Sequence, residues 1–222
     1  MITKRIVDLS LPLSAETVTY PGDPRPQIEM LSTIERDGAN TSRVVLSTHA
    51  GTHVDVPYHL LEQGESVDEL ALDSFCGSAR TYDVSNKVLG SCISIDDLDA
   101  GLTVKRGEIA LIYTRSSDPA TNLSAKCCCT YLDTTLADWL IEKRVKAVGI
   151  DSMSVDSLDT LENGVHKRLL QNDILIFENL SNNLRLLVGK QAFFFGMPLK
   201  LIRADASPVR AFALCERDNN SY

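Results

Sequence analysis

The chain has 222 residues, of which 44% are hydrophobic and 23% charged, and its formal net charge is −8. These values are typical of an ordinary globular protein, and the length suits one sizeable domain. The acidic balance argues against a nucleic-acid-binding protein, which usually carries a basic patch. No run of about 18 apolar residues is present, so we expect no membrane-spanning helix. Asp8 interrupts the N-terminal apolar run too early for a signal peptide, and we therefore predict a cytoplasmic protein.

Short runs rich in β-branched and aliphatic residues recur along the chain, and each of them predicts a β-strand. They cover residues 6–9, 43–47, 79–84, 109–113 and 145–150. A helix is predicted over residues 134–143. Thr134 or Thr135 would cap its N-terminus, and Lys143 suits the negative end of the helix dipole.

The last third of the chain continues this alternation of helix and strand. A second helix is predicted from about Gly164 to Gln171, and the strand 174–177 then ends at Glu178. The tail from Phe193 to Leu214 alternates short apolar runs with Gly and Pro, which predicts two or three further strands. Because no linker or internal repeat divides the chain, we expect a single α/β domain over residues 1–222 with a mixed sheet.

The six cysteines do not indicate a disulfide framework. Without a secretory signal, disulfides are not expected. Three cysteines are consecutive but lack the C-x2-C spacing of a thiolate zinc site, so we interpret them as small apolar residues in or near a loop. The six are Cys76, Cys92, Cys127, Cys128, Cys129 and Cys215.

Histidine is scarce and clustered, since three of the four histidines fall within the eleven residues 49–59. The odd positions of this segment hold His49, His53, Asp55 and His59, and in a strand these side chains would share one face. The spacing of the first two would also fit one face of a helix. A glycine, a proline and several β-branched residues within the segment argue against a helix.

A straight strand could not present these residues to one metal ion. At about 3.3 Å per residue, His49 and Asp55 would lie roughly 20 Å apart, whereas metal–ligand distances are about 2 Å. One solution is a bend at Gly51-Thr52, because glycine tolerates positive φ. The other is that the ligands serve more than one metal ion, and both solutions can hold together.

Two histidines and one aspartate form a ligand set typical of a catalytic metal site that keeps one position open for water. Nitrogen and oxygen donors favour Zn²⁺ or Mn²⁺, with Fe²⁺ as a further option. Glu178 follows His166 by twelve residues and closes an apolar run, where a carboxylate is costly to bury without a partner such as a metal ion. His59 could be a ligand, an acid–base group or a loop residue.

The segment 49–59 resembles the His-x-Gly-Thr-His-x-Asp-x-Pro-x-His motif of the metal-dependent cyclase-like hydrolases, which include bacterial kynurenine formamidase and isatin hydrolase. The resemblance covers nearly the whole chain. Its other landmarks are Asp8-Leu9-Ser10, Tyr20-Pro21-Gly22-Asp23, residues 148–154, His166 before Leu169-Leu170, Glu178-Asn179-Leu180 and residues 198–210.

This resemblance implies a swivelling β/β/α fold and a homodimer or homotetramer. In the kynurenine formamidase pattern, two metal ions are bound, with Asp55 and Glu178 as bridging ligands. The first ion would be held by His49, His53 and Asp55, and the second by Asp55, His166 and Glu178. The isatin hydrolase pattern has a single manganese ion, held by the first set.

The activity that the resemblance implies is hydrolysis of an amide bond by metal-activated water, with His59 as proton donor and acceptor. The favoured substrate is the small molecule N-formylkynurenine. The formamidases carry a tryptophan before Pro-Gly-Asp that stacks on the substrate ring, and Tyr20 occupies this position here. A tyrosine can also stack. The alternatives are a cyclase, a dehydratase or a cyclic-amide hydrolase on the same fold, and, less favoured, a non-catalytic protein stabilised by metal.

Overall fold

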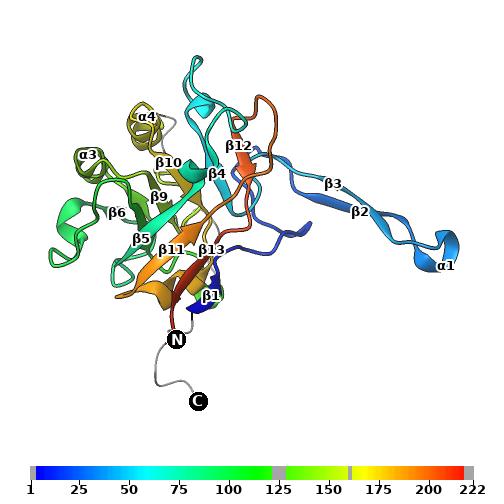
Figure 1. Cartoon of the computed structure of the whole chain (residues 1–222), viewed down its shortest axis with the longest axis horizontal. Coiled ribbons are helices and arrows are strands. Elements are labelled where there is room, and N and C mark those ends of the chain that lie inside the picture. The colour runs from blue at the N-terminus through cyan, green and yellow to red at the C-terminus, as the bar shows by residue number, and fades with distance from the viewer. Residues whose placement is uncertain (1–3, 122–128, 160–161, 218–222) are drawn as a thin grey trace.

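Figure 1 shows the computed structural model, which describes residues 4–121, 129–159 and 162–217. Its centre is a nine-stranded sheet in the order β1-β13-β11-β5-β7-β9-β10-β4-β12. Strands β5, β7, β9 and β10 pair in parallel, and all other neighbours are antiparallel, so the mixed sheet is confirmed. The nine strands are β1 (Lys4–Asp8), β4 (His53–Asp55), β5 (Cys76–Asp83), β7 (Ile109–Tyr113), β9 (Ala147–Ile150), β10 (Leu175–Glu178), β11 (Gln191–Phe195), β12 (Ala206–Pro208) and β13 (Phe212–Glu216).

The central strands are buried on both faces, as a parallel sheet requires. Every residue of β7 and of β9 is buried. One face of the sheet packs on a hydrophobic cluster that includes Phe177 and Phe194. The other face packs on helices α3 (Thr134–Lys143) and α4 (Gly164–Leu170), which lie side by side on the body and contact each other (Figure 1).

Most of the predicted elements are present, with shifted ends. The strand over 109–113 and the helix over 134–143 have the predicted bounds, and the tail forms three strands. The predicted cap of α3 was wrong: Asp133 caps it, because its side chain accepts a hydrogen bond from the amide of Leu136. Trp139 on this helix packs against the core, edge-on to Tyr82.

The structure adds elements that the sequence patterns did not predict. Strands β6 (Cys92–Ile93) and β8 (Tyr131–Leu132) form a small parallel sheet. Within the described residues, short 3₁₀ helices connect the strands at Pro57–His59, Leu72–Phe75, Ile95–Asp97, Pro119–Thr121 and Asn182–Leu187.

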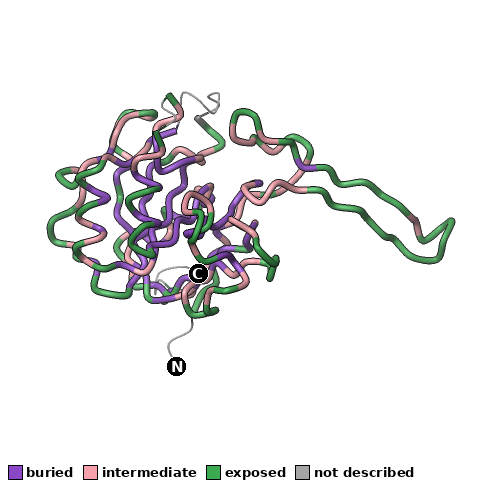
Figure 2. The backbone as a smooth tube through the Cα atoms, turned by 90° about the horizontal axis from the view of Figure 1, so that it is seen from above, coloured by how far each residue is buried: buried purple, intermediate pink, exposed green. Residues whose placement is uncertain are grey.

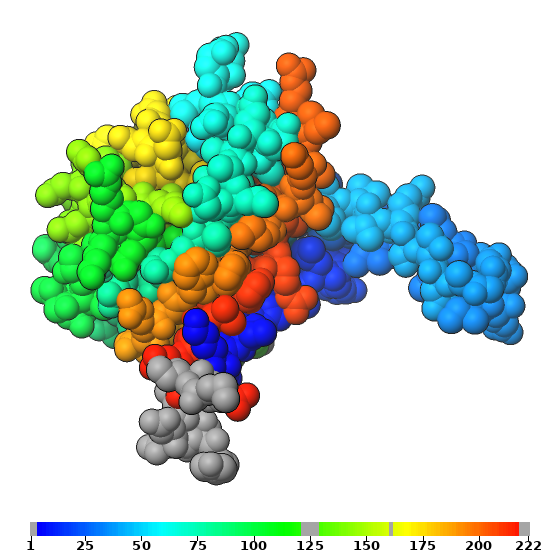
Figure 3. Space-filling model, in the orientation of Figure 1, coloured from blue at the N-terminus to red at the C-terminus, as the bar shows by residue number. Residues whose placement is uncertain are grey.

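A long hairpin projects from the body and is the most extended feature of the molecule (Figures 1 and 3). It consists of β2 (Gln27–Ser32), the short helix α1 (Ile34–Asp37) and β3 (Thr41–Val45), and we call residues 27–45 the β2–β3 arm. Strands β2 and β3 form a separate antiparallel sheet, and Figure 2 shows the arm exposed along almost its whole length.

Two sequence predictions concern the chain as a whole. Within the described ranges, none of the helices has the length and apolar character needed to cross a membrane; the cytoplasmic location stays a prediction. Cys127 and Cys128 lie outside the described residues, so the interpretation of the cysteine run is followed only at Cys129, which is buried and not disulfide-bonded.

Candidate metal centre and active site

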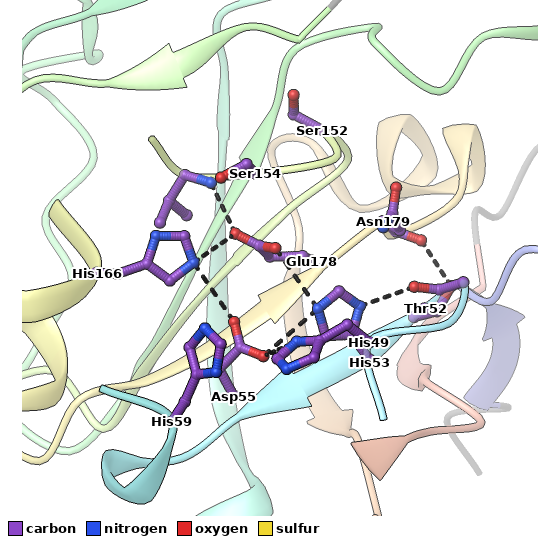
Figure 4. A network of polar contacts seen from close by, with 12 residues as sticks. His49, Thr52, His53, Asp55, His59, Ser152, Ser154, His166, Glu178 and Asn179 are labelled. Atoms are coloured by element: carbon purple, nitrogen blue, oxygen red, sulfur yellow. Dashed lines mark hydrogen bonds and ion pairs between the residues drawn. The ribbon is translucent and has the colours of Figure 1, made fainter. Parts of the chain in front are cut away.

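Sheet pairing brings three of the predicted ligands together. Strand β4 lies between β10 and β12, with Glu178 directly opposite His53. His53 and Asp55 are two residues apart, so in a pleated strand they point to the same face as Glu178. Helix α4 covers this face and supplies His166 from its first turn. Figure 4 shows the histidine side chains converging on Asp55 and Glu178.

The chain bends directly before β4, which is one of the two solutions that the reach of a metal ion left open. Gly51 has a φ of +63°, a conformation that favours glycine. The bend folds His49 back towards His53, and the centroids of their rings lie 5.0 Å apart. Thr52 holds the bend in place, because its hydroxyl donates to the carbonyl of Asn179 at 2.6 Å and accepts from the amide of Leu11. Segment 49–59 is therefore not one strand, and only its residues 53–55 are extended in the sheet.

The two buried carboxylates each face both sides of the cluster. Asp55 Oδ1 lies 2.9 Å from His49 Nδ1 and 3.4 Å from His53 Nε2, whereas Asp55 Oδ2 lies 3.5 Å from His166 Nε2. Glu178 Oε2 lies 3.5 Å from His53 Nε2, and its Oε1 lies 3.1 Å from His166 Nε2. One oxygen of each carboxylate thus faces His53 and the other faces His166, whereas His49 lies beside Asp55. Each carboxylate therefore has oxygens directed to both sides of the cluster.

The cluster contains polar atoms that only a further partner would satisfy. His53 Nε2 and both carboxylate oxygens of Asp55 are buried, and none of the ring-nitrogen contacts to Asp55, at 2.9–3.5 Å, has the geometry of a hydrogen bond. Leaving such atoms unpaired is costly. A tetrahedral ion with ligands at about 2.0–2.2 Å separates them by roughly 3.4 Å, close to the spacings seen between these atoms. The donor set is nitrogen and oxygen from His, Asp and Glu, so these residues fit a metal cofactor.

Neighbouring groups already orient the histidines for this role. The His53 Nδ1–H donates to the carbonyl of Gly51 at 2.8 Å, which leaves the Nε2 lone pair facing the carboxylates. His166 Nδ1 lies 2.7 Å from Asp156 Oδ2, and its Nε2 faces Glu178. Metal-binding histidines are typically held by a carbonyl or carboxylate in this way.

The charges in the cluster depend on each other. Burial opposes protonation of His53 and His166, but the adjacent carboxylates outweigh it and raise the pKa of both imidazoles. Burial would raise the pKa of Asp55 and Glu178, and the histidines instead lower the pKa of both carboxyls. The carboxylates therefore remain ionised in an interior position, and a cation is the natural counter-ion for them.

His59 stands at the edge of the cluster. It lies in the 3₁₀ helix that follows β4, its side chain is partly exposed, and its ring centroid is 4.4 Å from that of His49. Its Nδ1 lies 3.2 Å from Asp205 Oδ2. His59 can reach a molecule bound over the metal ligands, as an acid–base group must.

A cavity of about 250 Å³ opens over the ligands. Tyr20, the predicted substrate-binding residue, forms part of its wall, and so do Asp23, Met153 and Asn163. The structure thus brings all seven predicted site residues to one cavity. Their individual roles stay predictions.

Sequence reasoning missed two carboxylates that hold the histidines, Asp156 and Asp205. Asp156 lies ten residues before His166 and accepts from its backbone amide as well as its ring. Asp205 lies more than 140 residues from the two histidines that it contacts. Asp151 accepts hydrogen bonds from the amide and the hydroxyl of Thr114, the residue that follows β7.

Comparison with known proteins identifies the family. The family described as "Putative cyclase" matches residues 7–157, which is more than half of the chain. The chain belongs to the cyclase family. Relatives in this family include the kynurenine formamidase of Bacillus cytotoxicus, with 34% identity over 92% of this chain and 95% of the relative. The kynurenine formamidase of Bacillus mycoides has 33% identity over 95% of this chain and 98% of the relative.

Solved structures of cyclase-family hydrolases have the same fold. Isatin hydrolase A from Ralstonia solanacearum superposes with a TM-score of 0.84 at 25% identity, over 96% of this chain and 92% of the other. A protein described as a potential metal-dependent hydrolase with cyclase activity gives a TM-score of 0.79 over 97% of this chain and 100% of the other. The fold expected from the resemblance is confirmed. Together with the relatives, this makes the chain a hydrolase of the cyclase family, and the ligand cluster supports a metal cofactor.

Proposed function

We propose that this protein is an arylformamidase that hydrolyses N-formylkynurenine to formate and kynurenine. The observation that carries the proposal is the pair of buried carboxylates, Asp55 and Glu178, shared among three histidines beneath a cavity with His59 at its edge. Similarity to kynurenine formamidases over more than nine-tenths of the chain supports the substrate.

The proposed cofactor is Zn²⁺, one or two ions per chain, with Mn²⁺ as the alternative. Nitrogen and oxygen donors suit both ions. His49, His53 and Asp55 would hold the first ion, and His166 would hold a second with Asp55 and Glu178. Bound there, such ions supply Lewis-acid chemistry and make water a nucleophile near neutral pH.

The side chains around the cavity have separate tasks in this proposal. The carboxylates of Asp55 and Glu178 offset positive charge and orient what binds beside them. His59 gives a proton to the amine as the carbon–nitrogen bond breaks, which an imidazole can do near neutral pH. The ring of Tyr20 in the cavity wall packs against the aromatic ring of the substrate.

The test is a direct assay of purified protein loaded with Zn²⁺ or Mn²⁺, and elemental analysis gives the number of ions per chain. We expect formate release from N-formylkynurenine, no activity after chelation, and recovery on adding metal back. A His53→Ala preparation controls for contaminating hydrolases. Failure of every metal form to release formate would reject the proposed substrate.

A second candidate is hydrolysis of a cyclic amide such as isatin. The structural similarity to isatin hydrolase A favours it, and so does Tyr20, which stands where the formamidases have tryptophan. Isatin is therefore assayed beside N-formylkynurenine, and the larger kcat/KM decides between them. Tyr20→Ala is expected to raise KM for the true substrate, whereas Tyr20→Trp preserves N-formylkynurenine turnover if that compound is the substrate.

The non-catalytic alternative differs in what chelation does to the fold. A metal that only stabilises the fold would leave an unfolded chain when removed. The catalytic proposal expects a folded, inactive protein with an unchanged far-ultraviolet circular dichroism spectrum, because the core clusters on both faces of the sheet do not include the metal ligands.

We further propose that the protein forms a homo-oligomer, a homodimer or homotetramer, through the β2–β3 arm. Register pairs Ile28 with Val44 and Met30 with Ser42, so these residues share one face of the arm. On that face Ile28, Met30 and Val44 are each more than half exposed. A two-stranded hairpin alone is marginally stable in water, and a second copy packed on the apolar face would stabilise it.

The oligomer is tested by light scattering coupled to size-exclusion chromatography. Val44→Lys on the apolar face is expected to shift the protein towards the monomer. Thr41→Lys adds the same charge on the opposite face and is expected to leave the mass unchanged. A wild-type protein that is monomeric at high concentration would reject this proposal.

A further inference from the structure

We propose that Asp205 is a positioning residue that fixes the tautomer and direction of His59 and ties it to the metal ligand His49. The inference rests on the function proposed above for His59. Asp205 directly precedes β12, and its backbone carbonyl accepts a hydrogen bond from the amide of Val56 at 3.2 Å. The pairing of β12 with β4 therefore holds its backbone beside the segment that carries His59.

The Asp205 carboxylate accepts hydrogen bonds on both oxygens. Its Oδ2 lies 2.9 Å from His49 Nε2 and 3.2 Å from His59 Nδ1, and its Oδ1 accepts the Thr48 hydroxyl at 3.0 Å. An ionised carboxylate can only accept, so both imidazole nitrogens that face it must donate. One oxygen thus determines which nitrogen carries the hydrogen in two rings.

For His59 the consequence is a defined reacting atom. With its hydrogen on Nδ1 and directed at Asp205, the neutral ring has its lone pair on Nε2. A proton is then taken up and given back at Nε2. For His49 the same oxygen holds the hydrogen on Nε2, which leaves Nδ1 for the metal side, where it lies 2.9 Å from Asp55 Oδ1.

Stability alone gives little reason for this arrangement. The Asp205 side chain is 36% exposed, and ion pairs at such positions contribute little to folding. The specific property of the contact is geometric, because it joins the acid–base residue to a metal ligand through a single atom. Without it, the His59 ring could turn and mix its two tautomers.

The first test is kinetic, with Asp205→Ala at saturating metal. We expect a fall in kcat with little change in KM, bounded by the His59→Ala loss of about 10²–10⁴-fold that general acid–base catalysis contributes. Because Asp205 acts through His59, Asp205→Ala should cause little further loss in a His59→Ala background. Thr48→Val removes the other contact to the same carboxylate and is the matched control, expected to retain most activity.

Chemical rescue separates positioning from a general structural role. The site is partly exposed, so added acetate can occupy the space left in Asp205→Ala and accept from His59 again. We expect acetate to raise kcat of Asp205→Ala towards the wild-type value. Acetate should not raise kcat of the wild-type protein or of the double variant with His59→Ala. Absence of rescue together with additive losses in the double variant would overturn the proposal.

A third test does not depend on turnover. With only four histidines in the chain, ¹⁵N labelling of histidine resolves each imidazole, and His59→Gln assigns the signal of interest. We expect the Nδ1–H tautomer for neutral His59 in wild-type protein with and without Zn²⁺, and a mixture in Asp205→Ala. An Nε2–H tautomer in wild type would refute the role of Asp205 even in an active enzyme. If the expected tautomer is observed but the protein hydrolyses neither N-formylkynurenine nor isatin, only the proposed function is rejected.

Discussion

Replacing Asp151 by Asn should change how the stability of the protein depends on pH. Asp151 follows β9 and is 2% exposed. Its Oδ1 accepts hydrogen bonds from the amide and hydroxyl of Thr114, both at 2.7 Å, and its Oδ2 accepts the Ser117 hydroxyl at 3.3 Å. Burial raises the pKa of Asp151 to about 6, and these hydrogen bonds offset only part of the effect.

The sign and size of the effect follow from the pKa difference between the folded and unfolded states. A change from 3.8 to about 6 corresponds to about 3 kcal/mol at 1.36 kcal/mol per pH unit. The folded state binds the proton more tightly, so this stability is fully present below about pH 4. It is lost as the pH rises through about 6. The side-chain amide of the Asp151→Asn variant would be neutral throughout, and it can still pair with Thr114 and Ser117.

The assay is urea unfolding between pH 4 and pH 8 with chelator present throughout, so that metal binding does not contribute. Relative to Asp151→Asn, the wild-type free energy of unfolding should fall by about 2.4 kcal/mol between pH 4 and pH 7, because a small part of the total is already lost at pH 4. Asp97→Asn is the control of opposite sign. Burial opposes the ionised form of Asp97, but the hydrogen bonds from Lys87 and Ser94 together outweigh it and lower the pKa, so its contribution is lost as the pH falls. A pH-independent difference for Asp151→Asn would refute the reasoning.

Three further predictions concern the metal centre and the core. His53→Ala should lose bound metal and activity together, as measured by elemental analysis and assay; an active, metal-loaded variant would contradict its role as a ligand. His59→Ala should retain most of the metal while kcat falls by about 10²–10⁴-fold, and full activity would remove His59 from the mechanism. Gly196→Ala should destabilise the protein by about 1–3 kcal/mol in urea unfolding, because a Cβ there would lie 2.3 Å from the ring of Phe177. Gly164→Ala, where a Cβ meets nothing within 4 Å, is the control, and equal stabilities would show that the core adapts.

Elements governed by local pattern could be predicted from the sequence. The strand 109–113 and the helix 134–143 have the predicted bounds, because an apolar run and a 3.6-residue period are properties of neighbouring residues. The β2–β3 arm was only half predicted. Its second strand, with a threonine and two valines, was marked by β-branched residues, whereas the first strand has only Ile28 of that kind.

The structure of the motif at residues 49–59 was predicted in part. Residue types and spacing indicated a metal site, and the reach of a metal ion left either a bend or more than one ion; Gly51 provides the bend. In a strand the even positions would form the opposite face, and Ala50 and Val54 are fully buried. Tyr58 is exposed, because the strand ends at Asp55 and a 3₁₀ helix begins at Pro57.

The sequence by itself determined which chemistry is available, since ligand type, the glycine at the bend and the family motif are all encoded within eleven consecutive residues. Only the tertiary structure decided how that chemistry is arranged. Register between β4 and β10 sets Glu178 against His53, and the pairing of β4 with β12 brings Asp205 to His49 and His59. These contacts join residues more than 120 positions apart in the chain. No local pattern can specify them, because they depend on how the strands pair in the folded sheet.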